Sequence, residues 1–203
     1  DSVDLSKFGG RFKYSKVLNV IDDVDRSITS NITRVRIRRN LRALVNQEAQ
    51  YELCFGNRFH INAGGFNIKS TGFKIINEPD VVYLTDIPNA DGRTGVLSIV
   101  KPIPETGENR VIVKSAGLVD YIKGEVILTT VLITSTVLAD DIIEVQAFPE
   151  SNDVVGLKDL YLEFDVSKST INMIKDTISS GEKISGVGFK VTSSYSNGEL
   201  IRG

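Results

Sequence analysis

The feature that most constrains this chain is its excess of side chains branched at Cβ. The 203 residues include 22 Val, 22 Ile and 13 Thr, but only 7 Ala. Branched side chains are stiff in helices and pack well on pleated sheets. Since 41% of the residues are hydrophobic, the chain can also build a sizeable core. We therefore expect an α+β fold that is mostly β, an elongated antiparallel β domain with two short amphipathic helices.

Two segments depart from the strand pattern because their apolar residues recur with the 3.6-residue period of a helix. The first follows Ser15, a good N-cap, and predicts a helix from Lys16 to Thr29. The second follows Ser167 or Ser169 and predicts a helix from Thr170 to Ser179. The residues that form the two apolar stripes are Val17, Leu18, Ile21, Val24 and Ile28, and then Ile171, Ile174 and Ile178.

Between these helices the sequence alternates short β-prone runs with turns rich in Gly, Asn and Asp, a spacing typical of all-β domains. The predicted strands are Ile32–Arg39, Tyr51–Phe55, Phe73–Ile76, Val81–Asp86, Gly95–Val100, Arg110–Lys114, Glu125–Thr134, Ile142–Ala147 and Leu160–Val166. We expect an N-terminal arm over residues 1–13 and a β-rich structural domain over residues 14–203, which could divide into two lobes.

Charge is distributed unevenly along the chain. Residues 1–60 hold 11 Lys or Arg and 7 Asp or Glu, a net +4, while the remainder holds 13 and 19, a net −6, giving the total of −2. Such polarity is typical of a subunit that packs against copies or neighbours, although it also arises without any function. A net charge so close to zero does not indicate attraction of the whole chain to nucleic acid or to a membrane.

A row of arginines is the strongest local charge feature: Arg34, Arg36, Arg38, Arg39 and Arg42. A strand would place the first three on one face, about 6.5 to 7 Å apart. Such a row can be a solvated face or a protein interface. Nucleic acid is the weakest reading, because no aromatic side chains are interleaved for base stacking. These five residues are our candidate interface.

The residue inventory argues against enzymatic chemistry. The chain has one Cys and one His, too few for a structural zinc site of Cys and His ligands, and any catalytic triad would have to be built around His60. Turn-prone residues separate Cys54 from His60, and we interpret Cys54 as a small buried hydrophobe and His60 as a packed or surface residue. We expect no catalytic, cofactor-binding or metal site, no membrane span and no signal peptide. Because the chain begins at Asp1, we expect a piece of a longer polypeptide.

Several runs, taken in order, carry a resemblance to a known family. They are Tyr14–Arg39, Tyr51–Asn57, Val82–Asp86, Gly117–Glu125, Ile142–Pro149 and Val166–Asn172. Together they resemble the C-terminal part of the baseplate wedge protein family, gene product six, of T-even type contractile-tailed phages, which is related to the baseplate J-like proteins. Within Gly117–Glu125, Gly124 permits a tight turn that Tyr121 can cover, and we expect these two residues to be structural.

The resemblance implies a late virion protein of the tail baseplate, present in the host cytoplasm during assembly. It implies a homodimer and a higher ring that joins neighbouring wedges around the tail hub, with other wedge proteins as partners and without a cofactor or enzymatic activity. The alternative that we keep open is an adhesin-like or carbohydrate-binding β module.

Overall fold

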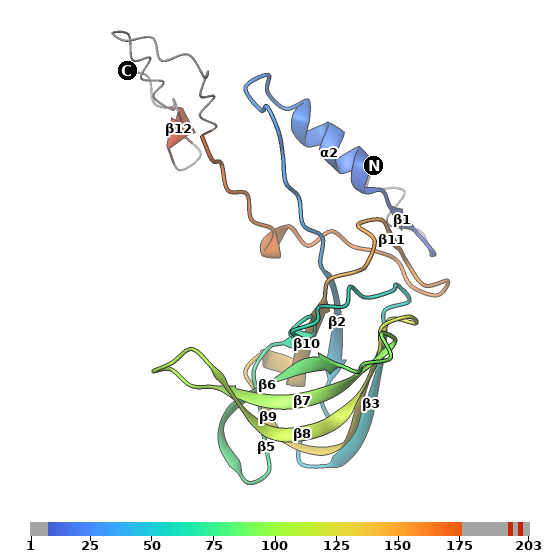
Figure 1. Ribbon diagram of the computed structural model, residues 1–203, viewed down its shortest axis with the longest axis vertical. Coiled ribbons are helices and arrows are strands. Elements are labelled where there is room, and N and C mark those ends of the chain that lie inside the picture. Colours follow the sequence, from blue (N-terminus) through green and yellow to red (C-terminus); the bar gives the residue numbers. More distant parts are fainter. Residues whose placement is uncertain (1–7, 176–194, 197–198, 201–203) are drawn as a thin grey trace.

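The computed structural model describes residues 8–175, 195–196 and 199–200 (Figure 1). The described chain is mostly β with one α-helix, which confirms the mostly β expectation. The elements in chain order are β1 (Arg11–Phe12), α2 (Tyr14–Asp22), β2 (Ile37–Arg42), β3 (Glu48–Cys54), β4 (Lys69–Ser70), β5 (Phe73–Ile75), β6 (Glu78–Pro88), β7 (Thr94–Pro102), β8 (Asn109–Asp120), β9 (Glu125–Thr136), the 3₁₀ turn η1 (Ala139–Asp141), β10 (Ile142–Ala147), β11 (Val154–Val155), the 3₁₀ turn η2 (Val166–Lys168), β12 (Tyr195–Ser196) and β13 (Glu199–Leu200).

The main sheet curls into a barrel-like structure. Its strand order is β3-β9-β5-β6-β7-β8, and a further antiparallel pairing of β8 with β9 joins β9, β5, β6, β7 and β8 in a closed circuit. Closure requires a close approach at Gly117 of β8, where an added Cβ would lie 1.9 Å from the Ile127 carbonyl oxygen of β9. Because the sheet closes in this way, the elongated shape that we expected for the β domain is not confirmed.

A smaller sheet packs beside the barrel, with strand order β2-β10-β4. Strand β2 pairs antiparallel with β10 along its whole length, from Ile37 opposite Ala147 to Arg42 opposite Ile142. Every second residue of β10 is buried, and in β2 Leu41 is buried while Ile37 and Arg39 on the same face are half-buried. Both strands therefore alternate between a covered face and a more exposed one. The two sheets share one core, whose largest fully buried side chains are Tyr121, Phe59, Phe73, Ile68, Leu97, Ile99, Leu128, Ile133, Ile143, Val82, Val119 and Val126.

The helix predictions are correct for one helix only. The helix predicted over Lys16–Thr29 is present as α2, but it starts at Tyr14 and ends at Asp22. Lys13 occupies the N-cap position without a side-chain hydrogen bond, so the predicted Ser15 cap is wrong. The helix predicted over Thr170–Ser179 is wrong over residues 170–175, which are not helical, and its remaining residues lie outside the described chain. Branched Ile and Thr in this stretch lower its helix propensity.

One strand prediction is wrong over part of its range, since only residues 37–39 of Ile32–Arg39 lie in β2, and another is wrong over its whole range. Residues 32–36 are extended but unpaired, because the partner strand β10 ends at Ala147 opposite Ile37. Residues 160–165 have no paired strand either, and residues 166–168 form η2. The other predicted strands are present as β3, β5, β6, β7, β8, β9 and β10, and β10 has the predicted bounds.

A buried polar contact holds the turn between β8 and β9. Gly124 adopts a φ of +69°, and an added Cβ there would lie 1.9 Å from the Asn57 carbonyl oxygen. Tyr121 is buried, and its hydroxyl donates to Asp86 Oδ2 at 2.6 Å. The other carboxylate oxygen of Asp86 accepts the Ile68 N–H at 2.6 Å. Asp86 thus links the turn, strand β6 and the segment that precedes β4.

Candidate assembly surface

Two segments leave the same end of the barrel, as Figure 1 shows. The helical arm comprises residues 8–36 and includes β1 and α2, while the C-terminal arm comprises residues 157–175 and includes η2. The most exposed large hydrophobic side chains of the described chain lie on these arms, namely Ile32 at 91%, Ile171 at 89% and Ile174 at 88%. These exposed apolar side chains make the two arms candidates for contact with another molecule.

Helix α2 lacks the features that stabilise an isolated helix. It is 9 residues long, whereas helices shorter than about 12 residues are marginal in water. It has no side-chain N-cap and no buried residue, and Asp22 and Asp23 lie at its C-terminal end, where the helix dipole disfavours negative charge. Of its apolar side chains, Val17, Leu18 and Ile21 are partly buried, whereas Val20 is 67% exposed. Helix α2 therefore depends on contacts outside itself, and its own chain covers its apolar side chains only in part.

Polar contacts fix the base of the helical arm while leaving its apolar side chains accessible. Strand β1 pairs with β11, and the Tyr14 N–H donates to Asp153 Oδ1 at 2.8 Å. The Tyr14 hydroxyl donates to the Thr33 carbonyl oxygen at 2.8 Å, so the chain after the helix folds back along it. Asn31 Nδ2 completes this return by donating to Asp22 Oδ1 at 2.5 Å. The helix therefore has a defined position from which it can present its surface.

The C-terminal arm crosses the chain near the start of β2, where an ion-pair network holds it. The Arg38 guanidinium lies 2.6 Å from Asp165 Oδ2 and 3.0 Å from Glu144 Oε1 on β10. Lys168 Nζ adds a longer contact, 3.7 Å from Glu144 Oε2. A hydrogen bond from the Ser167 hydroxyl, together with the nearby positive charge of Arg38, holds the pKa of Asp165 below its ordinary value. We call this network the Arg38 clasp.

The arginine row is only partly in a strand. Arg38, Arg39 and Arg42 belong to β2, whereas Arg34 and Arg36 precede it. Arg39 is half-buried on the opposite face, and the other four are exposed. The Arg36 guanidinium lies over the Phe148 ring, 5.0 Å from its centroid. Part of the row therefore binds its own chain, through Arg38 and Arg36, and a role of the row at an interface stays a prediction.

Cys54 and His60 are not brought into a catalytic arrangement. Cys54 is half-exposed on β3, so its interpretation as a buried hydrophobe is wrong. Its thiol donates to Glu52 Oε1 at 3.4 Å and lies close to the Glu125 carboxylate. Desolvation and the neighbouring carboxylates raise the pKa of the Cys54 thiol, which disfavours the nucleophilic thiolate. His60 is exposed.

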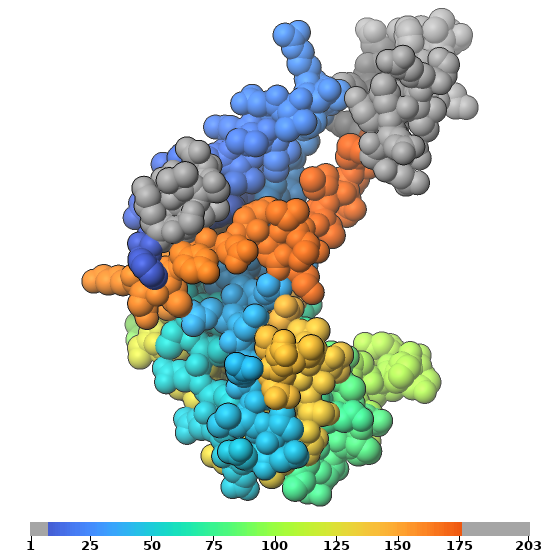
Figure 2. All heavy atoms as spheres, turned by 180° about the vertical axis from the view of Figure 1, so that it is seen from behind, coloured from blue at the N-terminus to red at the C-terminus, as the bar shows by residue number. Residues whose placement is uncertain are grey.

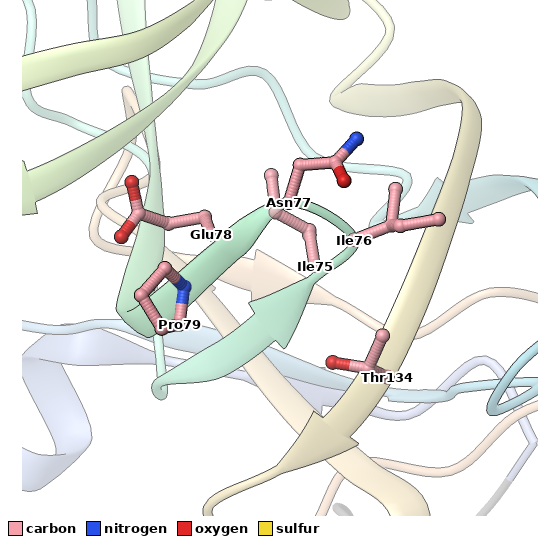
Figure 3. Close-up of a pocket in the computed structure, with 6 residues that line it drawn as sticks. All are labelled: Ile75, Ile76, Asn77, Glu78, Pro79 and Thr134. Carbon is pink, nitrogen blue, oxygen red and sulfur yellow. The ribbon is translucent and has the colours of Figure 1, made fainter.

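A shallow hollow of about 410 Å³ lies at the turn between β5 and β6 (Figure 3). Ile75, Ile76 and Pro79 line much of it, and Thr134 of β9 closes one side. Its single carboxylate, Glu78, lies 3.5 Å from Lys101 Nζ. A nucleophile paired with a base, as covalent catalysis needs, is absent from this lining.

The sequence predicted only part of the structure of the two arms. The apolar stripe identified the helix, but it did not show that the helix would lie away from the core. The partners of Arg38, namely Glu144 and Asp165, were not predicted either. The alternation of acidic and apolar residues over residues 159–165 was the available signal, since it marks a two-faced segment that has no paired strand in this fold. No helix among the described residues is long and apolar enough to cross a membrane.

The N-terminal part of the chain, which contains the helical arm, is similar to a known protein family. Residues 1–40 match the family model of baseplate structural protein gp6, C-terminal domain III. The matched range contains β1, α2 and the arginine row except Arg42. No curated protein matches the chain. The similarity supports a gp6-like phage baseplate structural protein, and it covers the segment that carries the exposed helix.

Proposed function

We propose that this protein is a structural component of a phage tail baseplate wedge. It dimerises and joins a ring that connects neighbouring wedges around the tail hub, contacts other wedge proteins and acts without catalysis or a cofactor. It resides in the virion and passes through the host cytoplasm during assembly. The observation that carries this proposal is that α2, within the stretch similar to a baseplate domain, has no fully buried side chain and only a partly buried apolar stripe.

The barrel and the arms have complementary roles in such a component. The barrel is closed and densely filled, so it supplies a rigid body. The arms place apolar residues outside that body, where they can reach a neighbouring molecule. Figure 2 shows the helical arm and the C-terminal arm projecting beyond the barrel as separate ridges. A rigid barrel with two arms that contact other molecules is suited to a scaffold built by repeated protein contacts.

The proposal is tested by weakening the helix contact. Val20→Asp places a carboxylate at the exposed apolar position of α2 and should weaken self-association at least about tenfold, because a charge buried in the contact would have no partner. Val137→Asp is the matched control, since Val137 is 61% exposed and lies outside both arms. Sedimentation velocity measures the association. Equal association constants for both variants would contradict the role of α2.

A second experiment addresses the location. A tag fused to this chain should appear at the baseplate end of the tail when complete particles are viewed by electron microscopy. Labelling of the head or of the tail tube, with none at the baseplate, would contradict the proposed location.

A further inference from the structure

Among the described strands, β2 has a partner on one edge only. On β10, the Glu144 N–H donates to Thr71 Oγ1 and its carbonyl accepts the Thr71 N–H, so the Glu144 backbone faces away from β2. On β2, the Ala43 N–H donates to the Asp141 carbonyl. Backbone groups alternate in direction along an antiparallel strand. The N–H and C=O groups of Arg38, Asn40 and Arg42 consequently point toward the open edge.

The two faces of β2 differ sharply beside this edge. The side chains of Arg38, Asn40 and Arg42 are exposed on one face, and Arg36 and Arg34 continue the positive charge beyond the strand. On the other face Leu41 is buried, Ile37 is partly buried against the core, and Arg39 lies half-buried between them. A strand added here would need acidic residues on one face and apolar residues on the other.

The chain itself contains a segment with this alternation. In residues 159–165, Asp159, Glu163 and Asp165 occupy one set of alternate positions, and Leu160, Leu162 and Phe164 occupy the other. The segment is part of no sheet, and its Phe164 is 53% exposed. Asp165 already pairs with Arg38, so the acidic positions and the arginine row are matched in charge. The backbone, however, is not paired with β2.

We propose that residues 159–165 of a second copy of this chain add to the open edge of β2 as a strand. The acidic positions would then lie against the arginine face, and Leu160, Leu162 and Phe164 would extend the apolar face that contains Ile37 and Leu41. Main-chain hydrogen bonds at Arg38, Asn40 and Arg42 hold the added strand. This inference rests on the proposed self-assembly and identifies one surface for it.

The added strand comes from a second copy, because residues 159–165 of the same chain are held in place at both ends. The Leu157 and Leu160 carbonyls accept the Gly9 N–H at 3.1 Å, which fixes the start of the segment beside β1. Its end is held at Asp165 by the ion pair with Arg38, and residues 159–165 form no strand pairing with β2. When two copies exchange residues 159–165, Asp165 still contacts an Arg38, and the backbone of the segment can form hydrogen bonds with the open edge of β2. Two β2 edges cannot pair with each other as readily, since arginine would lie opposite arginine.

Cross-linking between two differently substituted chains tests the exchange. In a Cys54→Ala background, one chain carries Asn40→Cys and the other carries Tyr161→Cys, Leu162→Cys or Glu163→Cys, and the two are co-produced. Because each chain has one thiol, a disulfide between the two variants can form only in trans, and only if the Cα atoms come within about 7 Å. We expect at least one of the three positions to give a covalent dimer. Glu105→Cys, in the exposed loop between β7 and β8, is the control that should not cross-link.

A charge change gives the second readout. Glu163→Arg should weaken self-association about tenfold, while Glu105→Arg, the same change in an exposed loop, should leave it unaltered. A dimer that forms with no trans disulfide and no effect of Glu163→Arg would overturn the strand exchange while leaving the proposed function intact. A chain that stays monomeric at every concentration tested would contradict both.

Discussion

At the residue scale, the barrel is organised around Asp86. This fully buried carboxylate accepts hydrogen bonds from the Tyr121 hydroxyl and from the Ile68 N–H. Tyr121 comes from the turn that Gly124 makes possible, and that turn is pressed against the backbone of Asn57. A buried polar group is expensive when it lacks partners, so each member of this cluster depends on the others. The cluster gives the barrel a unique arrangement at this end.

Gly124→Ala should lower the free energy of unfolding by at least about 2 kcal/mol. A side chain is disfavoured at a φ of +69°, and its Cβ would also collide with the Asn57 carbonyl. Gly92→Ala is the control, because Gly92 has a φ of +61° but nothing within 4 Å of an added Cβ. We expect about 1 kcal/mol for the control. Urea unfolding measures both, and equal losses would show that the close contact contributes nothing.

Tyr121→Phe should cost about 2 kcal/mol, since it removes a hydrogen bond to a buried carboxylate. Burial and the neighbouring Asp86 raise the pKa of Tyr121 above its ordinary 10.0. In the unfolded chain this tyrosine ionises near pH 10, while in the folded chain it keeps its proton. The contribution of Tyr121 is therefore complete below pH 10 and is lost as the pH rises further. Stability measured from pH 8 to 11 should fall less steeply in Tyr121→Phe than in the parent chain, and parallel curves would contradict this role.

At the element scale, the two arms are attached by different means. The helical arm enters the fold through the pairing of β1 with β11, whereas the C-terminal arm beyond residue 160 is held mainly by the Arg38 clasp. Ion pairs exposed to solvent are weak and are screened by salt. The C-terminal arm is thus the element most easily displaced, as a segment that exchanges partners must be.

Arg38→Gln should raise the hydrogen-exchange rate of residues 161–168 several-fold and leave the barrel protected. Arg34→Gln is the control, because Arg34 is an exposed arginine without an ion pair among the described residues. Added salt should act like Arg38→Gln. Lowering the pH should also raise this exchange rate, but only at low pH. The pKa of Asp165 is lowered, and the ion pair is lost only when the pH falls through this lowered pKa. Unchanged exchange in Arg38→Gln would show that the clasp does not hold the arm.

Sequence patterns predicted elements well where a partner strand exists to complete them. The predicted bounds of β10 are correct because this strand is paired on both edges and alternates cleanly. The same alternation over residues 160–166 did not produce a strand, since no neighbouring edge in the same chain pairs with it. Long-range pairing, such as Ile37 with Ala147, cannot be predicted from local spacing. For the same reason the sequence identified the arginine row but not the residues that bind it.

At the scale of the whole molecule, the structure combines a closed barrel with arms whose apolar side chains are exposed or only partly buried. A helix of 9 residues without a side-chain cap or a fully buried residue is not expected to persist alone in water. The similarity of residues 1–40 to a baseplate domain covers that helix. Both observations support the central claim that copies of this protein complete one another's surfaces.

The most direct test of that claim is the mass of the 22.3 kDa chain in solution, measured by sedimentation equilibrium over a wide range of protein concentrations. The account predicts a reversible increase from monomer to dimer and then to larger species as the concentration rises. The measurement should be made at low and high salt, because the arginine contacts are screened by salt. A single species of monomer mass at every concentration, with α2 protected from hydrogen exchange, would contradict it.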